Sequence, residues 1–275
     1  MAGFDGAAQT KAVLEAMRAL TRLDHDAPPA VIATRAIRAA QDLYCDGDPF
    51  AEIKARTTVE ALELYGAVKG DVVSKLSTME PVDRIRYCAK LAAAGNIIDF
   101  GVSSEFDLER TLKETLAGDL AIDHSELLYQ AIASGDSMLL ISDNAGEIVF
   151  DRFLLDEVVG SGKDVYVSVK SGGILNDAVR EDAIQAGIKE PIRIVETGSD
   201  GLGIVLEDCS DEFRDIFFRA GVVVSKGQAN YETLDDAPRS LFFILRAKCP
   251  IIAESMAIPA GASVLNHHPG SGLAF

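Results

Sequence analysis

The sequence predicts an α/β protein, in which a three-layer α/β/α sandwich with a mostly parallel sheet follows a helical N-terminal region. From residue 136 onward, short apolar runs rich in β-branched residues alternate with helical stretches, which indicates βαβ units with right-handed crossovers. Before that point, apolar residues recur at helical spacing and no β-rich run appears. We therefore expect a helical region over residues 1–135 and an α/β domain over residues 136–275.

The helical region is predicted from apolar residues on one face of each segment and from proline near several helix starts. Pro29, Pro49 and Pro81 each fit the first turn of a helix, where the missing N–H group has no intrahelical partner to lose. Gly66 and Gly70 could interrupt the longest helix. The predicted helices cover residues 7–23, 28–43, 51–76 and 84–94, with two more after Ser103 and after Asp123.

Five runs in the second half are predicted to be buried strands, because each is short, apolar and bounded by polar or glycine residues. They are Met138–Ile141, Val165–Val169, Ile192–Val195, Gly221–Val224 and Leu241–Leu245. Helices are expected over residues 148–158, 176–188 and 211–220 and near residue 231, and an apolar stretch follows at 250–257. The tail from Gly261, with His267 and His268, is expected to be irregular, and adjacent histidines there are more often solvated than metal-bound.

The composition excludes several classes of partner and compartment. Lys and Arg total 26 against 43 Asp and Glu, a formal charge of −17, which argues against sequence-independent binding to nucleic acid or anionic lipid. Residues 1–9 lack the features of a leader peptide, and no apolar run has membrane length, so we expect a cytoplasmic protein without a membrane partner. The four scattered cysteines, without Cys-x-x-Cys spacing, indicate neither a disulfide scaffold nor a zinc ribbon. The oligomeric state stays open.

The stretch from Ser137 to Glu147 is the centre of the chemical prediction. An apolar strand delivers Asp143 and Asn144 onto a turn that opens a helix, at the edge of a parallel sheet where ligands usually bind. Carboxylate and amide oxygens together suit a hard divalent cation. Asp143 and Asn144 are also ordinary turn and helix-cap residues, so this motif alone leaves both interpretations open.

Polar residues follow the other predicted strands as well, and parallel strands bring their carboxyl ends to one edge of the sheet. Two carboxylates and an amide for a divalent metal, together with lysines that neutralise charge, form the combination that phosphoryl chemistry uses. These residues are Asp143 and Asn144, Lys170 with Asn176 and Asp177, Ser225 with Lys226, and Lys248.

Five strings carry a resemblance to a known family: AGNIIDFG, SDNAGEIVFDRFLLDEV, VKSGGILNDAVREDAIQAGI, SKGQANYETL and LRAKCPIIA. Their identity and order resemble the domain of unknown function 89 family, whose members are metal-dependent damage-control phosphatases, and the likeness is closest to its compact prokaryotic branch. The chain lacks the Cys-x-x-Cys that members usually carry near the N-terminus. It also has Gly172 and Gly173 where relatives often have a proline, which puts the rigidity of that loop in doubt.

The resemblance implies a divalent metal, Mn, Ni, Co or Mg, in an α/β catalytic domain. It implies Asp143, Asn144 and Asp177 as metal ligands. The catalytic residues expected from the motifs are Asp143, Lys226 and Lys248, and the expected substrate contacts are Asn96, Glu147, Lys170, Ser225, Gly227 and Gln228.

The function predicted is a metal-dependent phosphatase that hydrolyses small phosphorylated metabolites. Whether Asp143 is only a ligand or also a transient nucleophile stays open. Haloacid-dehalogenase phosphatases need a second Asp two positions on, where this chain has Ala145. One alternative is an S-adenosylmethionine-dependent carboxyl methyltransferase, although no Gly-x-Gly turn follows the first strand. Another alternative is a metal- or metabolite-binding protein without turnover.

Overall fold

The computed structural model describes residues 6–22, 27–43, 47–95, 112 and 116–271, and it confirms the α/β class. Within these residues a seven-stranded sheet has the order β1-β7-β6-β5-β2-β3-β4. Neighbouring strands are parallel except for β6 and β7. The strands are β1 (Ile122–Asp123), β2 (Ser137–Ile141), β3 (Asp164–Val169), β4 (Arg193–Glu196), β5 (Val222–Lys226), β6 (Leu241–Arg246) and β7 (Ser263–His268).

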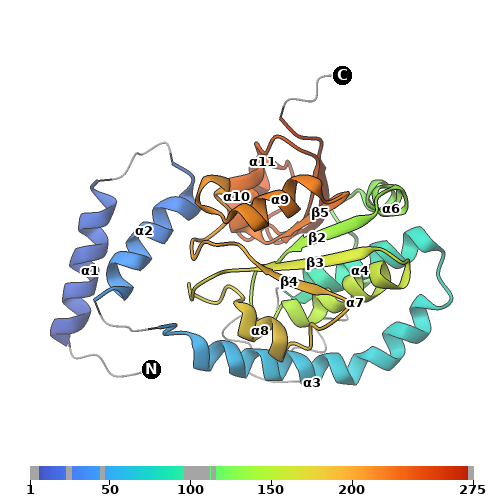
Figure 1. Ribbon diagram of the computed structural model, residues 1–275, viewed down its shortest axis with the longest axis horizontal. Helices are drawn as coiled ribbons and strands as arrows, with labels where there is room; N and C mark the ends of the chain where they lie inside the picture. The colour runs from blue at the N-terminus through green and yellow to red at the C-terminus, as the bar shows by residue number, and fades with distance from the viewer. Residues whose placement is uncertain (1–5, 23–26, 44–46, 96–111, 113–115, 272–275) are drawn as a thin grey trace.

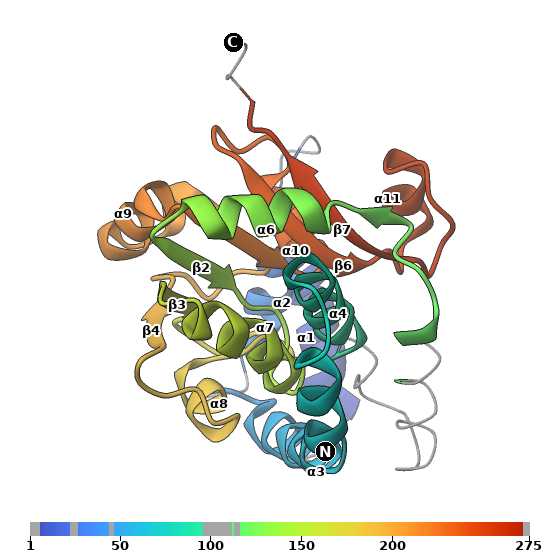
Figure 2. The ribbon, with the colours of Figure 1, turned by 90° about the vertical axis from the view of Figure 1, so that its right-hand side faces the viewer.

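Helices cover both faces of the sheet, as Figures 1 and 2 show. One buried cluster joins the sheet to the helices α3, α4, α6, α7 and α8, and a second joins its other face to α9, α10 and α11. Side chains alternate along a strand, so Val222 and Val224 of β5 belong to the first cluster and Val223 to the second. The helices are α1 (Gly6–Leu20), α2 (Pro29–Gln41), α3 (Ala51–Leu76), α4 (Pro81–Gly95), α6 (Ser125–Ser134), α7 (Ile148–Gly160), α8 (Arg180–Gln185), α9 (Asp211–Arg219), α10 (Gln228–Leu234) and α11 (Pro250–Ser255).

The described part of the N-terminal region before β1 is helical, as predicted. The long helix α3 continues through Gly66 and Gly70, so neither glycine interrupts it. In Figure 1, α3 runs along the lower edge of the molecule, and the hairpin of α1 and α2 lies at the left. Most of the helix predicted after Ser103 falls outside the described residues, and its described positions 112, 116 and 117 are helical. The domain division at residue 135 stays a prediction.

Two segments differ from the sequence prediction. The tail from Gly261 is not irregular, because residues 263–268 form β7, whose Val264 and Leu265 are fully buried against antiparallel β6. His267 is part of this strand, and its Nε2 lies 2.9 Å from the Ser240 hydroxyl at the sheet edge where β6 begins. Flanking glycine and proline residues concealed this short strand in the sequence.

The second difference concerns residues 176–188, which were predicted to be one helix. The helix is confined to α8, because residues 176–179 instead pair with backbone on the loops after β2 and β3. Leu175 precedes them with a φ of 47°, a left-handed conformation that a helix cannot continue through. Every helix in the described ranges is too short or too polar to cross a membrane.

Candidate active site

A pocket of about 380 Å³ lies where β2, β5 and β6 end, against α2. One wall comes from the loops that follow β2 and β3, with Asp143, Asn144, Asn176 and Asp177. Another wall comes from α10 and the end of β6, with Gln228, Glu232, Arg246 and Lys248. Apolar residues of α2, Pro29, Ala30 and Ala33, close the remaining side.

Backbone pairing between the two acidic loops brings the predicted ligands together. The Ala145 N–H donates to the carbonyl of Asn176 at 2.9 Å, and the Ala178 N–H donates to the carbonyl of Asp143 at 2.8 Å. Asn144 and Asp177 face one another in this short antiparallel bridge. Two predicted ligands that are 33 residues apart in the chain, Asn144 and Asp177, therefore converge through main-chain hydrogen bonds.

Gly227 provides the space that the Asp143 side chain occupies. Its φ is 83° and its ψ is 165°, a region in which glycine is almost the only residue found. A β-carbon at this position would lie 2.1 Å from Oδ2 of Asp143. Gly227, in the string SKGQANYETL, therefore contributes to the site because it has no side chain.

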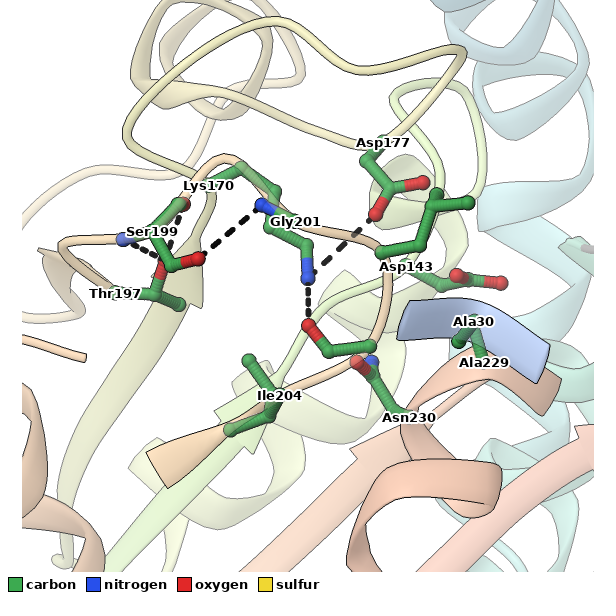
Figure 3. A network of polar contacts seen from close by, with 12 residues as sticks. Ala30, Asp143, Lys170, Asp177, Thr197, Ser199, Gly201, Ile204, Ala229 and Asn230 are labelled. Atoms are coloured by element: carbon green, nitrogen blue, oxygen red, sulfur yellow. Dashed lines mark hydrogen bonds and ion pairs between the residues drawn. The ribbon is translucent and has the colours of Figure 1, made fainter. Parts of the chain in front are cut away.

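The Asp177 carboxylate is held by the ammonium group of Lys170. Lys170, which follows β3, places its Nζ 3.6 Å from Oδ2 of Asp177 and donates to the carbonyl of Gly203. Figure 3 shows this amine between the Asp177 carboxylate and the loop that follows β4. Lys170 is only 3% exposed and does not line the pocket, so the geometry makes it a partner of Asp177 and does not support the predicted substrate contact.

A second buried lysine, Lys54 of α3, supports the same loop from the helical region. Its Nζ lies 2.6 Å from Oδ2 of Asp48 and 2.8 Å from Oδ2 of Asp182, and it donates to the Asp177 carbonyl at 3.2 Å. Asp48 also packs against Gly173, where a β-carbon would lie 2.3 Å from the Asp48 carboxyl carbon. Glycine in this loop therefore permits close packing against Asp48.

Lys226 and Glu147 do not occupy the positions expected for substrate-binding residues. The Lys226 ammonium is fully buried, donates to Glu147, and lies 2.7 Å from Oδ1 of Asp151 and 3.0 Å from the carbonyl of Ala92. The alternation of β5 explains this, because Lys226 shares the face of Val222 and Val224, which α4 and α7 cover. We therefore correct the prediction of a phosphate contact for Lys226 and of a substrate contact for Glu147.

The other predicted residues have separate outcomes. Lys248 and Gln228 line the pocket, whereas Ser225 is fully buried within β5 and does not. Asn96 lies outside the described residues, so its predicted substrate contact stays a prediction. Arg246 was missed as a pocket residue, although it lies within the LRAKC string that carried the resemblance.

The pocket wall that carries Asp143 and Asp177, called the acidic wall below, brings two buried carboxylates together. Burial, followed by repulsion from Glu147 and Asp177, raises the pKa of Asp143 well above its usual range. Burial raises the pKa of Asp177 to about 6, although Lys170 and Lys54 oppose that shift. Both shifts mean that the anionic carboxylates lack sufficient positive charge around them.

The donor set fits a divalent cation. A cation between Asp143 and Asp177 would offset the burial and repulsion that raise their pKa values, and the Asn144 amide would add a neutral oxygen. In the described residues, no group of three His, Cys, Asp or Glu side chains is arranged to hold a metal. Asp143, Asn144 and Asp177 would supply two carboxylates and one amide, which leaves coordination positions on the cation for water and substrate.

Comparisons with known proteins relate this chain to one family. Residues 4–264 match the model of the damage-control phosphatase ARMT1-like domain. An uncharacterized protein from Methanocaldococcus jannaschii is 37% identical, covering 87% of this chain and 80% of that protein. A damage-control phosphatase from Archaeoglobus fulgidus is 30% identical, covering 86% of this chain and 81% of that protein.

The structural comparison leads to a relative that the sequence comparison also finds. A damage-control phosphatase from Pyrococcus horikoshii is 32% identical, covering 96% of this chain and 90% of that protein. The crystal structure of a DUF89 family protein from the same organism matches with a TM-score of 0.87 at 31% identity, covering 97% of this chain and 92% of that chain.

Proposed function

Because the chain belongs to the damage-control phosphatase ARMT1-like family, we propose that it is a metal-dependent phosphatase that hydrolyses small phosphorylated metabolites. The observation that carries this proposal is the pairing of the loops after β2 and β3, which places Asp143, Asn144 and Asp177 on one wall of a pocket. Cationic side chains, Arg246 and Lys248, line the same pocket.

In this proposal the acidic wall holds Mn, Ni, Co or Mg through Asp143, Asn144 and Asp177. When bound, the cation supplies Lewis acidity toward the phosphoryl group. Lys248 and Arg246 face the same space and bind phosphate oxygens by charge-assisted hydrogen bonds. Gly227 keeps Asp143 in place, and Lys170 keeps Asp177 in place.

The size and lining of the pocket support a small substrate. A volume of about 380 Å³ is at the low end for pockets that bind small molecules. Ala30 and Ala33 place an apolar surface of α2 against the part of the substrate that lies away from the metal. We infer that the leaving group is compact and carries some apolar surface.

The test is a phosphate-release screen on a panel of small phosphomonoesters, using protein treated with chelator and then supplied with Mn²⁺. We expect release of inorganic phosphate only with metal. Activity equal in both samples would contradict metal dependence. Absence of phosphate release, combined with transfer of a methyl group from S-adenosylmethionine, would replace the proposal by the methyltransferase alternative.

A further inference from the structure

The orientation of the Asn144 amide has a visible structural cause. An asparagine side chain presents an oxygen acceptor on one side and an NH₂ donor on the other, and its neighbours decide which side faces which way. Nδ2 of Asn144 lies 3.2 Å from Oδ2 of Asp143 and 3.3 Å from Oε2 of Glu147. Both neighbours are carboxylate oxygens, which accept hydrogen bonds, so the amide nitrogen belongs on that side. The amide oxygen is then the atom left for the pocket.

Glu147 is itself held firmly. Its other carboxylate oxygen, Oε1, accepts from the Lys226 ammonium, and Glu147 is only 2% exposed. Lys226 directs its remaining donors to Asp151 and to the carbonyl of Ala92. Three elements, α4, α7 and β5, therefore fix one carboxylate whose Oε2 accepts from the Asn144 amide. Burial excludes the water that would otherwise compete for these hydrogen bonds.

We propose that Glu147, held by Lys226, is a positioning residue that keeps the oxygen of the Asn144 amide directed at the metal. This inference rests on the proposed function, because it assigns a role toward the proposed cation. Outer partners of this kind orient the groups that bind a metal and change its affinity when they are altered.

Glu147→Gln tests the proposal with almost no change of shape. If the new amide keeps its oxygen on Lys226, its NH₂ group faces the NH₂ group of Asn144, and two donors then oppose one another. The Asn144 amide relieves this conflict by turning over, which directs an N–H donor at the cation. We expect Mn²⁺ to bind the metal-free variant about 10-fold or more weakly than the parent.

Asp151→Asn is the control for loss of charge. It removes the charge of the other carboxylate that contacts Lys226. The new amide keeps an oxygen for Lys226, and the Glu147–Asn144 contact is unchanged. A general electrostatic effect would weaken Mn²⁺ binding similarly in both variants. The positioning role predicts a clearly larger loss in Glu147→Gln.

A double-mutant cycle with Asn144→Asp supplies a rescue. Asn144→Asp alone sets two carboxylates against each other, whereas the double variant Asn144→Asp/Glu147→Gln restores one donor facing one acceptor. We expect the double variant to bind Mn²⁺ more tightly than the sum of the two single effects predicts, beyond the few tenths of a kcal/mol by which independent sites deviate. Additive effects would overturn the positioning role.

The measurements are Mn²⁺ dissociation constants from calorimetric titration of metal-free protein, with thermal unfolding in chelator to confirm that each variant folds. If the parent binds Mn²⁺ and Glu147→Gln binds it equally well, this inference is wrong and the proposed function stands. If the parent itself binds no Mn²⁺, the proposed metal site and this inference both fail. Lys226→Met, which removes the ion pair with Glu147, should also weaken Mn²⁺ binding. If that variant does not fold, the isosteric Glu147→Gln decides the matter.

Discussion

Replacing Gly227 by alanine should displace Asp143 and so remove activity without unfolding the protein. The added β-carbon would lie 2.1 Å from Oδ2 and 2.2 Å from Cγ of Asp143, where no real β-carbon comes closer than 3.0 Å. The carboxylate must therefore move by about 0.9 Å, and a misplacement near 1 Å is enough to cost about 100-fold in rate.

The substitution also strains the backbone, and this loss of stability has to be separated from the effect of displacing Asp143. Alanine at a φ of 83° is strained by about 1–3 kcal/mol, whatever space surrounds it. Gly162 offers a matched control, since its φ is 79° and a β-carbon there would meet nothing within 4 Å. Gly162 lies between α7 and β3, at the sheet edge away from the pocket.

The assay compares parent, Gly227→Ala and Gly162→Ala in three measurements: thermal unfolding of the metal-free protein, the rise in melting temperature on adding Mn²⁺, and phosphatase kcat/KM. We expect both variants to lose stability because of the positive φ, and Gly227→Ala to lose more because its β-carbon also displaces Asp143. Only Gly227→Ala should lose the Mn²⁺ effect and about 100-fold or more in kcat/KM. If Gly227→Ala matches Gly162→Ala in activity and in the Mn²⁺ effect, Asp143 does not need the position seen here and our account of the site is wrong.

Three further predictions concern the metal, the cationic wall and the acidic wall. Dialysis against a chelator should abolish phosphatase activity but leave the circular dichroism spectrum unchanged, and Mn, Co or Ni should restore activity better than Ca, which prefers larger sites; full activity without metal would contradict this. Lys248→Ala should lower kcat/KM by about 10-fold or more with unchanged metal content, because a charge-assisted contact to phosphate is lost, and an unchanged kcat/KM would remove Lys248 from the site. The raised pKa of Asp177, about 6 against an ordinary 3.8, means that the metal-free protein loses stability as pH rises from about 4 through about 6. Asp177→Asn should remove much of this loss, so that above pH 6 the metal-free variant is at least as stable as the parent, whereas Mn²⁺ should raise the melting temperature of the parent alone. Equal Mn²⁺ stabilisation of both proteins would show that Asp177 is not a ligand.

The sheet and the meeting of the acidic loops could be predicted from the sequence because both follow from local pattern and parallel topology. Alternating apolar runs gave the five strands β2 to β6, and polar residues after them gave Asp143, Asn144 and Asp177. Lys248 was predicted in the same way, and it lines the pocket. Each of these inferences needs only the order of elements along the chain.

The prediction for Lys226 was wrong because it used only the position of the residue at the end of a strand. It ignored the alternation of side chains between the two faces of the sheet. Val222, Val224 and Lys226 have the same parity, so the apolar pair already indicated that the lysine points under α4 and α7. Lys54 is different, since its partners lie on loops and helices remote in sequence, and no local pattern gives the tertiary packing of α3 against α8. Strand β7 was missed because its few residues are flanked by glycine and proline.

The two buried lysines have a consequence for how the chain unfolds. Lys54 comes from the N-terminal helices and neutralises Asp182 beyond residue 135, while Lys226 comes from the sheet and bonds to a carbonyl of α4. Separating the halves would break the Lys54–Asp182 ion pair and the hydrogen bond from Lys226 to the Ala92 carbonyl, and breaking a buried ion pair is strongly unfavourable. We therefore expect the helical region and the sheet to melt in one cooperative transition, so that a cation bound at the sheet edge also protects α3 and α4 from hydrogen exchange.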